Sequence, residues 1–99
     1  MRDIYAYRQV AVQSRLIGGE VQIHPMAGQA FASTLSVQCA LRLRDPALYP
    51  VGTRFLLSAK LTDRQGGTPF LYAYHGDADV VLSVSAAKAF LAEFRRGRI

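Results

Sequence analysis

The chain has 99 residues, of which 51% are hydrophobic and 19% charged, and its formal net charge is +5. This length suits one domain with a modest core, and the composition excludes an intrinsically disordered protein. The single cysteine, Cys39, excludes an intramolecular disulfide and a cysteine-based zinc site. The longest uncharged stretch, residues 26–41, is interrupted by Gly, Gln, Ser and Thr and cannot span a bilayer. Since no apolar leader follows Met1, we expect a soluble cytoplasmic protein without membrane association.

The first part of the chain alternates in the manner of a half-buried strand. One face carries Ile4, Ala6, Arg8, Val10 and Val12, and the other carries Tyr5, Tyr7, Gln9 and Ala11. Gly18-Gly19 can form a tight hairpin turn, which pairs Leu16 with Val21 and Ser14 with Ile23. We therefore predict a long, bent strand over residues 3–17 and a second strand over 20–24, ended by Pro25.

Residues 24–34 show no clear period and are expected to form a covering loop or one helical turn. Residues 35–44 alternate more sharply than any other stretch, which predicts a strand. Its apolar face is Leu35, Val37, Cys39, Leu41 and Leu43, and its polar face is Ser36, Gln38, Ala40, Arg42 and Arg44. Asp45-Pro46 should end this strand, and residues 49–52 suggest a turn with Pro50 second and Gly52 fourth.

A central hairpin is predicted from strands over residues 53–64 and 69–75 around Gly66-Gly67. Its first strand has one face of Phe55, Leu57, Ala59 and Leu61 and another of Arg54, Ser58, Lys60 and Thr62. A turn at the two glycines places Leu61 opposite Tyr72 and Ala59 opposite Tyr74. This register puts both tyrosines on the apolar face, as core or rim residues.

The last part of the chain predicts a helix over residues 85–96, preceded by a turn and a short sixth strand or lead-in over 80–84. Ser83 or Ser85 can cap the helix, Gly97 suits its C-terminal end, and its apolar stripe is expected to pack on the core. That stripe is Ala87, Phe90, Leu91 and Phe94. The whole chain, residues 1–99, is therefore predicted to be one α+β domain. Its five or six antiparallel strands should form a strongly curved sheet or small barrel. One helix cannot cover both sheet faces, so a homo-oligomer is expected.

Four basic residues fall on the expected outward faces of two consecutive strands: Arg42, Arg44, Arg54 and Lys60. They form a candidate site for nucleic acid or another polyanion, with Tyr5 and Tyr7 as candidates for an exposed aromatic surface. The alternative interpretation is that arginine simply supplies the polar, water-facing side of a strand.

A candidate ligand pocket comprises Tyr72, Tyr74, His75 and Asp77, at a barrel mouth or subunit interface. His75, Asp77 and Asp79 are the only cluster with metal-ligand or acid–base chemistry, but Gly and Asp are ordinary turn residues. Cys39 is expected to be a buried, unreactive thiol. We assign no catalytic residue, no metal site and no cofactor.

Between Tyr49 and Tyr74, several features are found together: Pro50, Gly52-Thr53, Phe55, the run Ala59-Lys60-Leu61-Thr62-Asp63-Arg64 and Gly66-Gly67. This quarter of the chain resembles short orphan proteins encoded by mobile integron gene cassettes. The resemblance implies an adaptive bacterial protein that forms a small oligomeric domain, and it carries no catalytic residues.

Three functional hypotheses follow. The first is a small β-rich binding or interaction module that self-associates. The second is a nucleic-acid or polyanion binder that uses the basic strand face. The third is a small-molecule binder or small enzyme with a pocket at a barrel mouth or between subunits.

Overall fold

A computed structural model describes residues 6–63 and 67–96. In this part of the chain the strands are β1 (Arg8–Ile17), β2 (Glu20–Pro25), β3 (Val37–Gln38), β4 (Arg54–Thr62), β5 (Phe70–Ala73) and β6 (Val81–Leu82). A 3₁₀ helix (Leu41–Arg44) lies between β3 and β4, and the helix α1 (Val84–Arg95) ends the described chain. The structure confirms a single small α+β domain.

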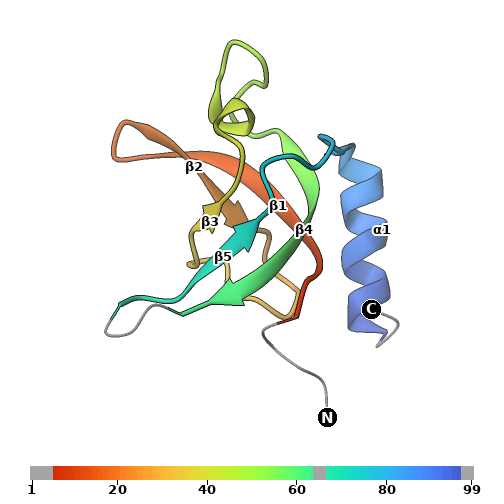
Figure 1. Cartoon of the computed structure of the whole chain (residues 1–99). Coiled ribbons are helices and arrows are strands. Elements are labelled where there is room, and N and C mark those ends of the chain that lie inside the picture. The colour runs from red at the N-terminus through yellow and green to blue at the C-terminus, as the bar shows by residue number, and fades with distance from the viewer. Residues whose placement is uncertain (1–5, 64–66, 97–99) are drawn as a thin grey trace.

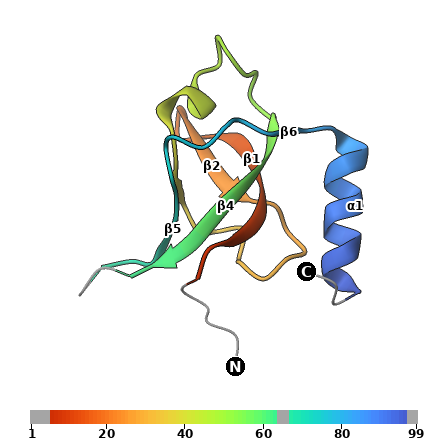
Figure 2. The same cartoon turned by 45° about the vertical axis from the view of Figure 1, so that its right-hand side comes forward.

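The strands curl into a nearly closed barrel, and α1 stands beside its wall (Figures 1 and 2). The strand order is β2-β1-β4-β5-β3, and β6 pairs with β4. All pairs are antiparallel except β3 with β5. No described helix has the length and apolar character needed to cross a membrane.

Alternate residues of the strands fill the interior of the barrel. The buried core is Val10, Val12, Ile23, Phe31, Val37, Cys39, Ala40, Leu43, Phe55, Leu57, Ala59, Leu71 and Ala73. Near the barrel end, the Tyr49 ring meets the Phe55 ring edge-on, with 5.0 Å between their centroids.

The first hairpin has the predicted register. Leu16 pairs with Val21 and Ser14 with Ile23, and Gly18 and Gly19 both have positive φ values in the turn. The strand begins at Arg8, later than predicted, and the predicted positions 3–5 lie outside the described residues. Pro25 ends β2 as predicted.

The prediction of a strand over residues 35–44 is wrong for most of its length. Only Val37–Gln38 forms a strand, and a 3₁₀ helix begins at Leu41. Leu41 is 72% exposed, whereas Ala40 and Leu43 are buried. A 3₁₀ helix has three residues per turn, so it buries residues 40 and 43 together. The alternating pattern therefore agreed with the structure only through Cys39.

The predicted register of the second hairpin is wrong by one residue. Ala59 pairs with Ala73, Lys60 with Tyr72 and Leu61 with Leu71. A one-residue shift moves every side chain to the other face of the strand, so Tyr72 now shares the outer face with Lys60. The shift buries the fully apolar Leu71 and Ala73 and leaves the tyrosine hydroxyl near water.

The turn before β4 also differs from its prediction. The Thr53 N–H donates to the Pro50 carbonyl at 3.1 Å, and Gly52 has a φ of +100°. Pro50 is thus first and Gly52 third in the turn, because the third position is where a positive φ is required.

Helix α1 was predicted almost to the residue. The Ser83 hydroxyl accepts a hydrogen bond from the Ala86 N–H at 3.1 Å and caps the helix. β6 occupies Val81–Leu82 within the predicted segment, and Gly97 lies outside the described residues. Helix α1 contacts β1 and β6. In the helix's apolar stripe, Ala87 is buried, whereas Phe90, Leu91 and Phe94 are only half-buried.

Candidate functional site

A row of three side chains crosses the outer face of the sheet. Arg8 of β1 pairs with Ala59 of β4, which brings the preceding residue, Tyr7, beside Lys60. The Lys60 Nζ lies 5.1 Å from the centroid of the Tyr7 ring, in cation–π contact. On its other side, Lys60 pairs across the strands with Tyr72 of β5. In the strand register, Lys60 therefore lies between Tyr7 and Tyr72, with its ammonium over the Tyr7 ring.

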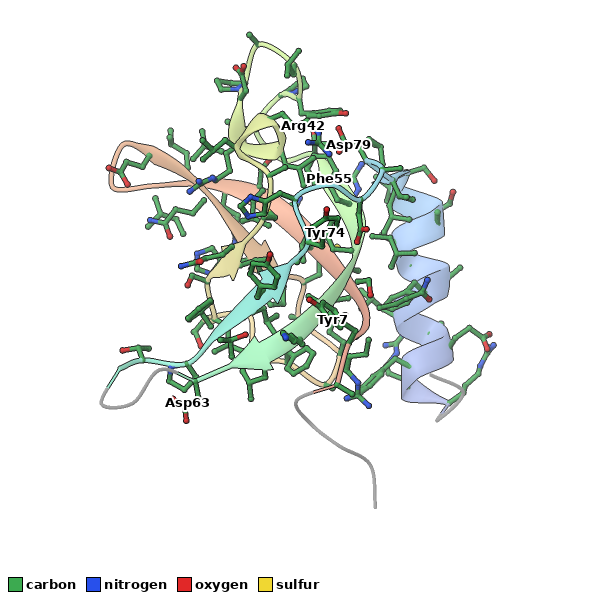
Figure 3. The ribbon with its side chains drawn as sticks, viewed as in Figure 1. Tyr7, Arg42, Phe55, Asp63, Tyr74 and Asp79 are labelled. Atoms are coloured by element: carbon green, nitrogen blue, oxygen red, sulfur yellow. The ribbon has the colours of Figure 1, made fainter. Side chains whose placement is uncertain are left out.

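Two more rings extend this row. His75 stacks on Tyr72, with 5.9 Å between ring centroids and 29° between ring planes. Tyr74, two residues after Tyr72, is 60% exposed. We call Tyr7, Lys60, Tyr72, Tyr74 and His75 the aromatic face; Figure 3 labels Tyr7 and Tyr74 on the same side of the barrel.

Gly76 makes room for the Tyr74 ring. A Cβ atom at this glycine would lie 2.5 Å from Cε2 of Tyr74, which is closer than side chains approach one another. The ring thus packs directly over the backbone of Gly76. This contact helps to hold an otherwise exposed ring in place.

A cavity of about 280 Å³ lies next to Tyr74, where the barrel wall is incomplete. The pairing of β4 with β5 ends at Ala59, and its pairing with β6 ends at Phe55. The cavity has an apolar floor and a polar rim. Its lining includes Cys39, Leu43, Leu57 and Ala73 below, and Gln9, Ser58, Tyr74, Asp77, Asp79 and Arg42 around the opening. Of the four residues predicted for a ligand pocket, Tyr74 and Asp77 line this cavity, whereas Tyr72 and His75 lie outside its lining.

Arg42 holds the segment that borders the cavity. Its Nε donates to both carboxylate oxygens of Asp79, at 2.8 and 3.0 Å, and its guanidinium also donates to the carbonyls of His75 and Asp77. The Tyr49 hydroxyl donates to Asp79 Oδ2 at 2.7 Å. Figure 3 shows Arg42 and Asp79 together near the end of β4. Both side chains therefore have a structural role in fixing residues 75–79.

These hydrogen bonds shift the pKa values of the participants. The pKa of Asp79 lies below its ordinary value, first because of the bond from Arg42 and then because of the bond from Tyr49. The same bonds raise the pKa values of Arg42 and Tyr49. Asp79 thus stays ionised and engaged, which makes it unsuited to serve as a general base.

The four predicted polyanion-binding residues occupy different surroundings. Arg42 and Arg44 lie on the 3₁₀ helix and not on a strand face, so the premise of a basic stripe along two strands is wrong. Arg54 and Lys60 lie six residues apart on β4, which corresponds to roughly 20 Å along an extended strand. Arg54 donates from Nη1 to the Gly52 carbonyl. Only Lys60 belongs to the aromatic face.

The other side chains with possible catalytic or metal-binding chemistry, Cys39 and His24, are buried within the fold. Burial raises the pKa of Cys39 to about 11, so its thiol is protonated at neutral pH. His24 is buried, with one ring nitrogen 3.1 Å from the Ser33 carbonyl and the other 3.0 Å from Gln22 Oε1. Among residues 6–63 and 67–96, no three His, Cys, Asp or Glu side chains lie close enough to hold a metal ion.

Comparison of the chain with models of known protein families, with curated proteins and with solved structures gave no match. The site is therefore interpreted from its geometry. Sequence reasoning missed the exposure of Tyr72 and Tyr74 because it assigned the wrong register. One signal in the sequence could have indicated the correct register: Leu71 and Ala73, which alternate with the two tyrosines, have no polar group and are better suited to the core.

Proposed function

We propose that the protein binds single-stranded nucleic acid on the aromatic face. The observation that supports the proposal is the row formed by Tyr7, just before β1, Lys60 of β4 and Tyr72 of β5, extended by the exposed Tyr74. Proteins that bind single strands stack bases on exposed aromatic rings and neutralise phosphates with nearby cations. A curved, outward sheet surface with tyrosines around a lysine provides both.

The geometry suits more than one nucleotide. Adjacent strands lie about 4.8 Å apart, so the row from Tyr7 to Tyr72 spans roughly 10 Å. Tyr72 and Tyr74 are separated by about 7 Å along the strand direction. Bases can therefore stack on Tyr72 and Tyr74 while Lys60 contacts an intervening phosphate.

The charge of the aromatic face sets the expected salt dependence. The aromatic face contains one lysine, Lys60, and no arginine, within a chain of net charge +5. For about one or two phosphate contacts, affinity should fall only about threefold to sevenfold between about 50 and about 200 mM salt. Stacking should therefore supply most of the binding free energy.

Fluorescence anisotropy with labelled oligothymidylate and oligoadenylate tests the proposal. Wild-type protein should bind both single strands, and a duplex of the same length should bind more weakly because its bases are already stacked. Tyr72→Ala and Tyr74→Ala should each weaken binding by about 1–3 kcal/mol, the usual contribution of one stacked base. Tyr49→Phe is a control, because the Tyr49 ring packs on Phe55 and not on the aromatic face.

Lys60→Gln and Arg15→Gln form a matched pair for the charge. Both remove one positive charge, but Arg15 lies on the projecting hairpin, away from the aromatic face. We expect a loss of affinity with Lys60→Gln and little change with Arg15→Gln. If the wild-type protein did not bind at low salt, or if the two variants had equal effects, the proposal that nucleic acid binds specifically on the aromatic face would be refuted.

Self-association is a second candidate function, supported by exposed apolar side chains. The 3₁₀ helix and residues 45–52 project from one end of the barrel (Figure 1), and they include the exposed Leu41, Leu48 and Val51. A second copy of the chain would remove this apolar surface from water. Sedimentation velocity should show a dimer at tens of micromolar that Leu41→Gln with Leu48→Gln dissociates, and a monomeric wild type would refute this candidate.

A further inference from the structure

A second cavity, of about 230 Å³, lies between α1 and the barrel. Three phenylalanine rings line it: Phe31 from the segment after β2, and Phe90 and Phe94 from α1. Arg8, Gln9, Gln29 and Ala30 complete the lining. We call this space the phenylalanine groove. The only side chain it shares with the cavity beside Tyr74 is Gln9.

The barrel side of the groove is held in place by hydrogen bonds. The Gln29 side-chain amide pairs with the backbone of Ala11 in the way that a neighbouring strand would. Its Oε1 accepts from the Ala11 N–H at 3.1 Å, and its Nε2 donates to the Ala11 carbonyl. Nε2 also donates to the Met26 carbonyl at 2.9 Å, and the Met26 N–H donates to the Ala11 carbonyl. These bonds fix the segment that carries Ala30 and Phe31, so this wall of the groove is preformed.

The helix side of the groove leaves apolar surface incompletely covered. Ala87 is fully buried, but Phe90 and Phe94, one and two turns further on, are only half-buried. Figure 2 shows α1 joined to the barrel through β6 at its N-terminal end and extending down alongside the wall. A ligand between the two phenylalanines and Phe31 would bury the remaining ring surface.

Arg8 supplies a cation at the edge of this apolar space. Its guanidinium lies 5.9 Å from the centroid of the Phe31 ring. Within residues 6–63 and 67–96, no hydrogen bond or ion pair engages this guanidinium. An arginine with its donors free is suited to bind a carboxylate through two parallel hydrogen bonds.

We propose that the phenylalanine groove binds a small aromatic carboxylate, with its ring among the three phenylalanines and its acid group on Arg8. The charge of Arg8 selects an anion, and the aromatic lining selects a ring that can pack edge-to-face. The volume is below the usual range of drug-sized pockets, which limits the ligand to one ring with a short acid chain.

The test uses 3-phenylpropanoate and its neutral amide, 3-phenylpropanamide, which have nearly the same shape. In ¹H–¹⁵N NMR titrations, the acid should cause saturable shifts at Ala30, Phe31, Phe90 and Phe94. The amide should bind about tenfold to a hundredfold more weakly, because it lacks the charged hydrogen bonds to Arg8. Shifts that map elsewhere, or no saturation, would overturn the proposal.

Three variants locate the interaction. Arg8→Gln should bring the affinity for the acid down to that for the amide, whereas Arg15→Gln, on the same strand, removes the same charge and should change neither. Ala30→Leu should fill the groove and abolish binding while the thermal midpoint stays close to that of wild type. Equal effects of Arg8→Gln and Arg15→Gln would overturn the proposal, as would a ligand-free dimer that covers these residues. Oligothymidylate binding should be unchanged in Ala30→Leu, which separates this site from the aromatic face.

Discussion

The one-residue register of the β4–β5 hairpin decides whether Tyr72 and Tyr74 are available for binding. Replacement of Leu71 by Ala tests it, because Leu71 is 0% exposed and belongs to the core cluster. Leu→Ala at a fully buried site costs about 3–5 kcal/mol, from lost burial and the cavity left behind. A domain of this size has a free energy of unfolding of about 5–15 kcal/mol, so the variant should still fold at low temperature.

The tyrosine variants should behave differently. Tyr74 is 60% exposed, so Tyr74→Ala should change the free energy of unfolding by about 0.5 kcal/mol or less. Tyr72 is half-buried between Lys60 and His75, and Tyr72→Ala should cost about 1 kcal/mol in lost cross-strand contacts. Leu71→Ala should lower the thermal midpoint by at least about 12 °C, at about 4–8 °C per kcal/mol for a domain near this size.

Urea unfolding followed by far-ultraviolet circular dichroism measures these differences in the free energy of unfolding, provided that its dependence on urea concentration is the same in each variant. If Tyr72→Ala or Tyr74→Ala destabilised the protein more than Leu71→Ala, the tyrosines would be the core residues. The register described above would then be wrong, and the aromatic face would not exist.

Three further predictions concern other parts of the chain. Hydrogen bonding to Arg42 lowers the pKa of Asp79 below 3.8. The ionised Asp79 should therefore contribute fully to stability above about pH 4, and this contribution should be lost as pH falls through the native pKa. Asp79→Asn should abolish this acid-dependent change in the urea midpoint. The thiol of Cys39, with a pKa of about 11, should react with a disulfide reagent at pH 8 only as fast as the protein opens, and a rapid reaction in the native state would contradict its burial. Ser83→Ala should cost about 1 kcal/mol because the Ala86 N–H loses its partner, whereas Ser85→Ala should cost less, and equal losses in thermal unfolding would argue against Ser83 as the cap.

Local signals in the sequence were sufficient to predict the structure where the backbone geometry depends on one or two residues. Gly18 and Gly19 both adopt positive φ, which left few alternative registers for the first hairpin. Ser83, one of the two predicted caps, precedes an apolar stripe of helical period and caps α1. In both places the residues that decide the structure are adjacent in the chain.

Alternation of apolar and polar residues was insufficient to predict the structure where a strand and a 3₁₀ helix would bury some of the same apolar residues. Over residues 35–44, both a strand and a 3₁₀ helix bury Leu43, and the burial of Ala40 and the exposure of Leu41 distinguish them. The parallel pairing of Val37 with Leu71 comes from a strand more than 30 residues later, which local pattern cannot reveal.

The second hairpin shows how a one-residue error in strand register changes the functional interpretation. The observed register buries Leu71 and Ala73 against the core, and the predicted turn at Gly66-Gly67 lies partly outside the described residues. The candidate site inherited this error, since Tyr72 and Tyr74 were assigned to the apolar face as core or rim residues. The contact of Arg42 with Asp79 joins residues far apart in sequence and depends on the 3₁₀ helix, so it was equally inaccessible to prediction.

Titration of fluorotyrosine-labelled protein with oligothymidylate, followed by ¹⁹F NMR, tests the nucleic-acid proposal most directly. The chain has five tyrosines, and single Tyr→Phe variants assign their signals. We predict saturable shifts for Tyr7, Tyr72 and Tyr74 and none for Tyr49, whose hydroxyl donates a hydrogen bond to Asp79 and whose ring packs on Phe55. Unchanged signals from Tyr72 and Tyr74 at saturating oligonucleotide would contradict the proposed function.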